Sequence, residues 1–114
     1  MTLIFKIVPQ SLWQTAIQEG CFKGAPVDLS DGFIHFSTAD QARETAQKHF
    51  VGQENLLLAA FDAGVLGDQL KWEPSRGGAL FPHLYADLDP ATAVWVKELP
   101  LGKDGDHVFP EMDE

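Results

Sequence analysis

The sequence predicts an α+β fold built from small, mostly antiparallel sheets and two principal helices. Two observations lead to this prediction. Helical apolar periodicity is confined to the first half of the chain, and short segments rich in branched and aromatic residues fill the second half. The expected order is strand, helix, strand, helix and then four strands. Helices early and strands late favour α+β over a doubly wound parallel sheet.

The length predicts a single domain over residues 1–114, because 114 residues suffice for one hydrophobic core but not for two. We expect the core to span residues 3–99. The remaining residues, 100–114, form an acidic tail punctuated by glycine and proline, which we expect to pack loosely.

The first strand is predicted over residues 3–8, because this β-rich segment ends at Pro9. A helix over residues 11–19 follows. Ser11 and Gln14 have the spacing of a capping box at its start. Gly20 is expected to end the helix in a left-handed conformation.

Residues 23–31 are expected to form an irregular loop, followed by a short buried strand over residues 32–36. A second capping box, Thr38 with Gln41, predicts a helix from residue 38 to about residue 49. Its inner face carries small residues, which allow close packing on a sheet.

The later strands are predicted at residues 55–62, 69–73, 80–84 and 92–99, and the first of these is the central strand because it is short and uniformly apolar. Pro74 stops the second and Pro82 interrupts the third. We expect four core residues in particular to be buried: Trp13, Ile34, Leu57 and Val94.

The composition excludes several classes of function. Seventeen Asp and Glu against eight Lys and Arg give a net charge of −9, and the cations are scattered, so we expect no nucleic-acid binding. No apolar run approaches a membrane span and the N-terminus lacks a signal peptide, which predicts a cytoplasmic protein with no membrane partner. The single cysteine, Cys21, cannot form an internal disulfide.

A first candidate segment, residues 31–38, places His35 inside an apolar strand and Ser37 and Thr38 at the turn into a helix. Free N–H groups at a helix start attract anions, so this turn is a candidate ligand-binding site. The alternative is a core histidine with one hydrogen bond, followed by two hydroxyl residues that act only as caps.

A second candidate is the pair Trp72-Glu73 at a strand end. Desolvation beside a Trp raises the pKa of a carboxyl group, as general acid–base catalysis requires, and the indole offers a flat surface for a ring. The alternative is an exposed Glu on a strand whose Trp packs inward.

A third candidate is the pair His83 and Tyr85. In a strand, residues two apart point to the same side. The alternative is a rigid structural corner formed by Phe81 and Pro82. We expect His35, His83 and Tyr85 to converge on one partly exposed cleft, with Trp72 and Glu73 at its rim. His35, Glu73 and His83 would form a facial metal site if they converged, but without close histidine spacing or a CxxC motif we expect no metal.

Together these segments resemble a bacterial family catalogued as domain of unknown function 952. The resemblance is carried by Asp31-Gly32-Phe33-Ile34-His35-Phe36-Ser37-Thr38, Leu70-Lys71-Trp72-Glu73 and Phe81-Pro82-His83-Leu84-Tyr85, with Leu88 and Ala93-Val94 beyond them. Their order and spacing extend over nearly the whole chain to residue 99.

The resemblance implies no established activity, but it implies a fold related to the ADP-ribosyltransferases, which bind NAD between two small antiparallel sheets. His35 matches the position that holds the nicotinamide ribose in that superfamily. Lys6 stands on the first strand, where many family members have histidine, and a lysine can contact a phosphate. Glu73 is the candidate for the residue that orients the acceptor.

Two hypotheses about function follow. In the first, the chain is an enzyme or former enzyme with NAD as candidate cofactor, in which His35 and Glu73 are catalytic. The ligand is then bound by Lys6, Ser37, Thr38, Trp72, His83 and Tyr85. In the second, the same cleft belongs to a non-catalytic module that binds a small molecule or a protein. The ligand, the reaction and the oligomeric state stay open at this point.

Overall fold

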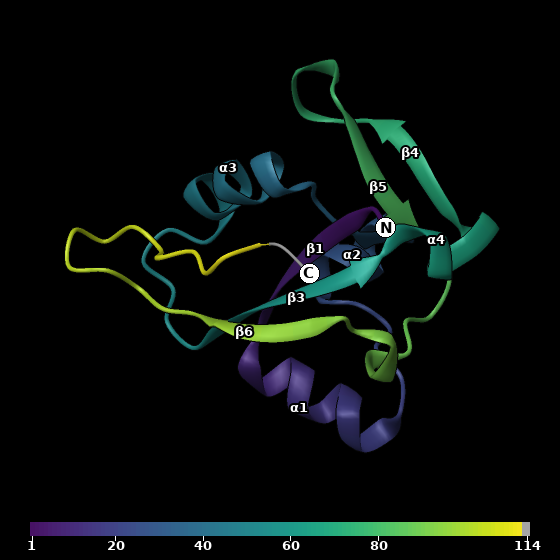
Figure 1. Cartoon of the computed structure of the whole chain (residues 1–114), viewed down its shortest axis with the longest axis horizontal. Coiled ribbons are helices and arrows are strands. Elements are labelled where there is room, and N and C mark those ends of the chain that lie inside the picture. Colours follow the sequence, from purple (N-terminus) through teal and green to yellow (C-terminus); the bar gives the residue numbers. More distant parts are fainter. Residues whose placement is uncertain (113–114) are drawn as a thin grey trace.

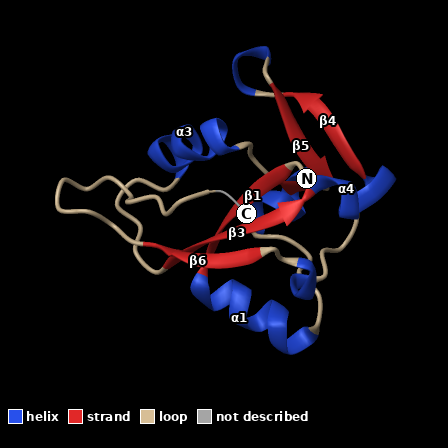
Figure 2. Ribbon diagram, in the orientation of Figure 1, coloured by secondary structure: helices blue, strands red, loops and turns tan. Residues whose placement is uncertain are grey.

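Two three-stranded antiparallel sheets form the framework of the protein in a computed structural model that describes residues 1–112. The first sheet has the strand order β1-β3-β6 (Figures 1 and 2). The second sheet has the order β2-β5-β4. The predicted α+β class with small antiparallel sheets is therefore confirmed.

The first sheet is built from β1 (Leu3–Pro9), β3 (Leu56–Asp62) and β6 (Trp95–Leu99), with β3 in the centre as predicted. Its side chains alternate between two cores, as the pleat of a strand requires. Ile4 and Val8 belong to the core on the side of helix α1 (Gln10–Glu19), whereas Phe5 and Ile7 face helix α3 (Ala39–His49). The two helices lie on opposite sides of this sheet (Figure 1).

The second sheet contains β2 (Ile34–His35), β5 (Leu80–Leu84) and β4 (Leu70–Pro74). Pro82 does not interrupt β5 as expected. The residues of β5 on both sides of Pro82 pair with β4 without a break. The sheets are joined at one isolated bridge between Phe5 and Ser37, whose backbone groups exchange hydrogen bonds of 2.8 and 2.9 Å. That junction fixes where β1 meets the second sheet.

The predicted helix ends are confirmed at α3 but corrected at the start of α1. Thr38 and Gln41 form the expected capping box, and Gly20 ends α1 with a left-handed φ of 75°. Ser11, however, lies inside α1 and caps nothing. The helix starts one residue earlier, at Gln10, whose N–H donates a hydrogen bond to the Asn55 carbonyl oxygen at 2.8 Å.

The expected loop over residues 23–31 was wrong in its second half, where α2 (Pro26–Asp31) forms. Proline at the first helical position and an acidic residue in the first turn are typical helix-start signals. The remaining short elements are α4 (Ala63–Leu66) and three 3₁₀ turns at Gly67–Gln69, Arg76–Gly78 and Pro90–Thr92.

The tail is attached more firmly than predicted. Leu101 pairs with His107, and the His107 ring nitrogen Nε2 lies 2.8 Å from the Gln53 carbonyl oxygen. Farther along, the Lys97 ammonium donates to the Glu111 carbonyl at 3.1 Å. The tail therefore returns along the first sheet to α3, as Figure 1 also shows.

Trp13 and Ile34 are buried as predicted, but Val94 is 38% exposed. Leu57 is only partly buried, whereas its neighbour Leu58 is fully buried. Because neighbouring strand residues face opposite sides, uniform apolarity in β3 could not tell which of the two leucines packs more tightly.

We expect Leu58→Ala to lower the free energy of unfolding by about 2–5 kcal/mol, the usual range for a fully buried leucine. Leu57→Ala is the matched control and should cost clearly less, because less of its side chain leaves water on folding. Urea denaturation of both variants measures the difference. Equal costs would contradict the burial of β3 described above.

Candidate functional site

A cavity of about 620 Å³ opens where β1 meets the second sheet. Phe5, Lys6 and Ile7 of β1 line one side, and His35, Phe81 and His83 line the other. The remaining wall is mostly apolar, with a few polar groups that include Asp31, Ser37, Thr45 and His49. A concave, largely apolar space of this size with a few polar groups is typical of a small-molecule site.

The buried carboxylate of Asp28 organises one side of this cavity. It accepts hydrogen bonds from the Lys6 ammonium at 3.0 Å and from the His35 ring nitrogen Nδ1 at 2.6 Å. The backbone N–H groups of Ala25 and His35 donate to it at 2.7 and 3.0 Å. Asp28 thus links β1, β2 and the start of α2 through a single side chain.

The loop before α2 has a glycine, Gly24, at the point where it packs against Asp28. Gly24 has a φ of +126°, a conformation that other residues rarely adopt. A Cβ atom at this position would lie 2.7 Å from the Cβ of Asp28. Both the backbone conformation and the close approach therefore require glycine here.

Burial and pairing act in opposite directions on the two charged groups of this cluster. Burial by itself raises the pKa of Asp28, but the hydrogen bond from His35 and the charge of Lys6 outweigh it and lower the pKa to about 2. Burial lowers the pKa of Lys6, although its contact with Asp28 opposes the change. Asp28 is ionised, because four donors surround its carboxylate.

His35 is engaged at both ring nitrogens. Nδ1 faces Asp28, and Nε2 lies 3.0 Å from a carboxylate oxygen of Asp31. A carboxylate only accepts hydrogen bonds, so the ring serves both partners at once only as the doubly protonated imidazolium. In that arrangement His35 is a positioned donor and has no free lone pair.

His83 is engaged at one nitrogen. Its Nδ1 lies 2.9 Å from Oε1 of Glu73, and the hydroxyl of Tyr85 donates to the same oxygen at 2.7 Å. The hydrogen bond from Tyr85, followed by that from His83, lowers the pKa of Glu73. The same contact with Glu73 raises the pKa of Tyr85. These groups form a second carboxylate–histidine pair beside the first.

Phe33 connects the predicted site residues, although the sequence analysis assigned it no role. Its ring centroid lies 4.2 Å from His83 in a stacked arrangement, 4.7 Å from His35 and 5.2 Å from Tyr85. The rings of His35, His83 and Tyr85 therefore gather around Phe33, but only His35 and His83 line the cavity, so the expected convergence on one cleft is met by these two alone. Phe33 and Asp28 are the two residues that sequence reasoning missed. The proline at the start of α2 was the one sequence signal that could have placed Asp28 in the first turn of a helix.

The other candidates are placed less centrally. Ser37 is buried, lines the cavity and lies 3.3 Å from the Thr45 hydroxyl, whereas Thr38 is occupied as the cap of α3. Trp72 pairs with Pro82, so it points to the opposite face of β4 from Glu73 and lies away from the cleft where we expected it. Glu73 and Tyr85 adjoin the cavity through His83 and do not line it themselves.

Among residues 1–112, no group of three or more His, Cys, Asp or Glu side chains is arranged to hold a metal ion. The facial set of His35, Glu73 and His83 is prevented by geometry, because Glu73 lies at Nδ1 of His83 while His35 is turned to Asp28 and Asp31. None of the helices in the described part of the chain combines the length and apolar character needed to cross a bilayer.

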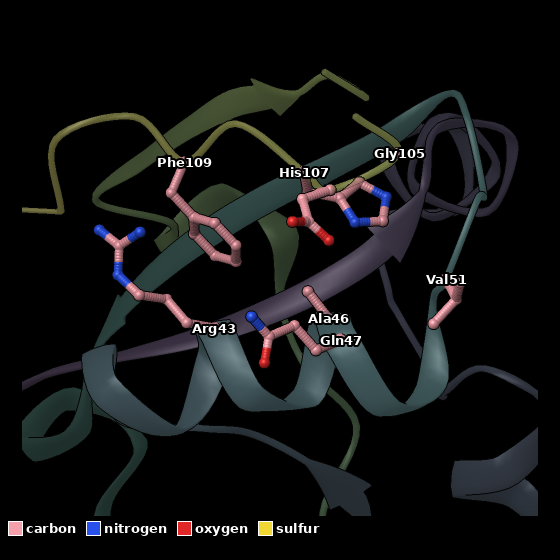
Figure 3. A pocket seen from close by; sticks show the side chains of 8 residues that line it. Arg43, Ala46, Gln47, Val51, Gly105, His107 and Phe109 are labelled. Carbon is pink, nitrogen blue, oxygen red and sulfur yellow. The ribbon is translucent and has the colours of Figure 1, made fainter. Parts of the chain in front are cut away.

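A second, smaller cavity of about 110 Å³ lies between α3 and the tail. Figure 3 shows Arg43 and Gln47 of α3 on one side and His107 and Phe109 of the tail on the other. The Arg43 guanidinium stands 4.8 Å from the Phe109 ring centroid, a cation–π distance. This space is the seam along which the tail packs, and it shares no residue with the inter-sheet cavity.

A family model described as protein of unknown function (DUF952) matches residues 7–96. The chain belongs to this family. The match includes His35, Glu73, His83 and Tyr85, and it ends before the tail that forms the second cavity. A comparison with curated proteins finds no match to this chain.

Solved structures similar to this DUF952 chain come from protein CC0527 of Caulobacter crescentus. Its crystal structure is 50% identical, covers 94% of both chains and has a TM-score of 0.91. Its solution NMR structure is 52% identical and covers 93% of this chain and 91% of that one, with a TM-score of 0.84. At this identity the likeness extends to the family as well as to the fold.

We expect Asp28→Asn to lower the free energy of unfolding by about 3–5 kcal/mol, because it leaves the buried Lys6 ammonium without its counter-charge. Asp31→Asn is the matched control. Its side chain is 47% exposed, so its loss should cost no more than about 1 kcal/mol. Chemical denaturation at neutral pH measures both free energies of unfolding. An Asp28→Asn variant that is as stable as the wild type would contradict the role given to this carboxylate.

The pH dependence of stability should carry the signature of Asp28. Its pKa is about 2 in the folded chain against an ordinary 3.8, so its contribution is fully present above pH 4 and is lost as the pH falls through 2. The difference corresponds to about 2 kcal/mol. Unfolding free energies measured from pH 5 to pH 2 should fall by that amount more in the wild type than in Asp28→Asn.

Proposed function

We propose that the inter-sheet cavity binds a small organic ligand, and that this ligand is NAD or another compound that carries ADP-ribose. The observation that supports it most is the cavity itself. It lies between two small antiparallel sheets, and Lys6 of the first strand lies on the same side as His35, both within reach of Asp28. That placement agrees with the resemblance to ADP-ribosyltransferases, in which the cofactor lies between two such sheets.

The walls suit a ligand with both aromatic and polar parts. Phe5, Phe36 and Phe81 offer apolar surface, while His35, Ser37 and His83 offer hydrogen-bonding groups among them. Lys6 and His35 are each paired with a carboxylate already, so the phosphates of such a ligand meet donors whose charge is largely neutralised. We therefore expect the phosphates to contribute less affinity than the rings and hydroxyl groups do.

A role in binding without turnover is the second candidate. It is favoured by the position of Glu73, which lies outside the cavity lining and is held by two hydrogen bonds. A carboxylate whose pKa is lowered is also a weaker base, which argues against Glu73 as a general base. If catalysis takes place, the histidines of the cleft are better placed to touch the ligand than Glu73 is.

We expect NAD or ADP-ribose to bind the wild-type chain in isothermal titration calorimetry. Val27→Trp should weaken that binding at least tenfold, because Val27 lines the cavity and a larger side chain there fills the space without removing a hydrogen bond. His35→Ala is a poorer probe, since it also removes a hydrogen bond from buried Asp28.

Val65→Trp is the matched control. Val65 is 62% exposed on α4 and does not line the cavity, so the same enlargement there should leave affinity unchanged. Wild-type protein that binds neither compound at millimolar concentration would refute the ADP-ribose proposal. Binding that Val27→Trp leaves intact would place the ligand outside this cavity. Incubation with NAD, followed by chromatography of the products, separates turnover from binding alone.

A further inference from the structure

His83 has an uncommon combination of burial and incomplete hydrogen bonding. The residue is only 5% exposed, and its ring lines the inter-sheet cavity. Its Nδ1 atom is bonded to Glu73, but within residues 1–112 no protein group hydrogen-bonds Nε2. A buried polar atom without a protein partner costs free energy unless water or a ligand supplies one.

The direction of the ring follows from its neighbours. His83 lines the cavity and its Nδ1 is bonded to Glu73, which does not line it, so Nε2 is the ring nitrogen left to meet a ligand there. Phe33 stacks on the ring at 4.2 Å and His35 meets it edge-on at 5.5 Å. These contacts leave the ring little freedom to flip or rotate.

We infer that His83 is the hydrogen-bond acceptor of the cleft, and that Glu73 and Tyr85 are positioning residues that keep its Nε2 lone pair directed at the ligand. The ionised carboxylate accepts from Nδ1–H, which leaves Nε2 without a proton in the neutral ring. Tyr85 donates to the same carboxylate oxygen. It therefore holds the Glu73 side chain in place, and Glu73 in turn holds the His83 ring.

The two histidines of the cleft then have complementary roles. His35 has both nitrogens committed to carboxylates and presents no lone pair, whereas His83 presents one. The cleft therefore favours a ligand that places an O–H or N–H group against His83. This statement rests on the proposed ligand cleft, but the state of the His83 ring does not depend on which ligand is bound.

Nitrogen-15 NMR of the ligand-free protein, labelled in its four histidine rings, tests the inference directly. In the neutral ring we expect His83 to carry its proton on Nδ1 and none on Nε2, with the assignment made from the spectrum of His83→Gln. A neutral ring with its proton on Nε2 would overturn the inference whether or not the chain binds NAD.

Variants of the positioning residues add a second readout. Glu73→Ala should shift the His83 proton away from Nδ1. Tyr85→Phe should do so in part, because it removes one hydrogen bond that holds the Glu73 carboxylate but leaves the carboxylate itself. Lys71→Ala is the matched control, since Lys71 pairs with His83 across the sheet but is not hydrogen-bonded to its ring. A tautomer that Glu73→Ala leaves unchanged would show that Glu73 does not position the ring.

Ligand titration separates this inference from the proposed function. If NAD binds, His83→Phe should weaken it roughly five- to tenfold, the usual effect of one neutral hydrogen bond, while keeping the stacking on Phe33. His49→Phe, which changes another histidine of the cavity wall, should have a smaller effect. Unchanged affinity in His83→Phe would overturn the acceptor role and leave the NAD proposal standing. Failure of NAD to bind, with the expected tautomer present, would refute the ligand alone.

Discussion

The buried carboxylate of Asp28 is the interaction on which the rest of the site depends. It joins an ammonium on β1, a histidine on β2 and the backbone at the start of α2. A buried charge is tolerated only where donors surround it, so the positions of Lys6 and His35 are coupled to that of Asp28. The wall of the inter-sheet cavity on this side is therefore held by ionic hydrogen bonds.

The cleft contains two carboxylate–histidine pairs that differ in what they leave unsatisfied. Asp28 and Asp31 together occupy both nitrogens of His35, whereas Glu73 occupies only one nitrogen of His83. The first pair is a closed structural unit that also presents a surface to the cavity. The second pair leaves one histidine nitrogen free toward the cavity. Residue types alone do not distinguish these pairs, because both consist of a histidine and an acidic partner.

The inter-sheet cavity lies beside the bridge that joins β1 to the second sheet. Phe5 and Ser37 are paired there, and no other backbone pairing between the two sheets is formed among the described residues. Side chains from both sheets line the space between them, which explains how Lys6 and His83 face one cavity although they stand far apart in the sequence. The family match over residues 7–96 contains nearly all of this framework.

Local sequence determined the elements whose signals are short-range. Thr38 and Gln41 marked the start of α3, Gly20 marked the end of α1, and the period of two placed His83 and Tyr85 on the same side of the chain at the end of β5. Only the tertiary structure decided that Asp28 is buried between Lys6 and His35, that Phe33 stacks on His83, and that Trp72 faces away. A contact such as that between Lys6 and Asp28 spans 22 positions and leaves no periodic trace in the chain. It forms because folding brings an ammonium and a carboxylate into the same apolar surroundings, where each needs the other.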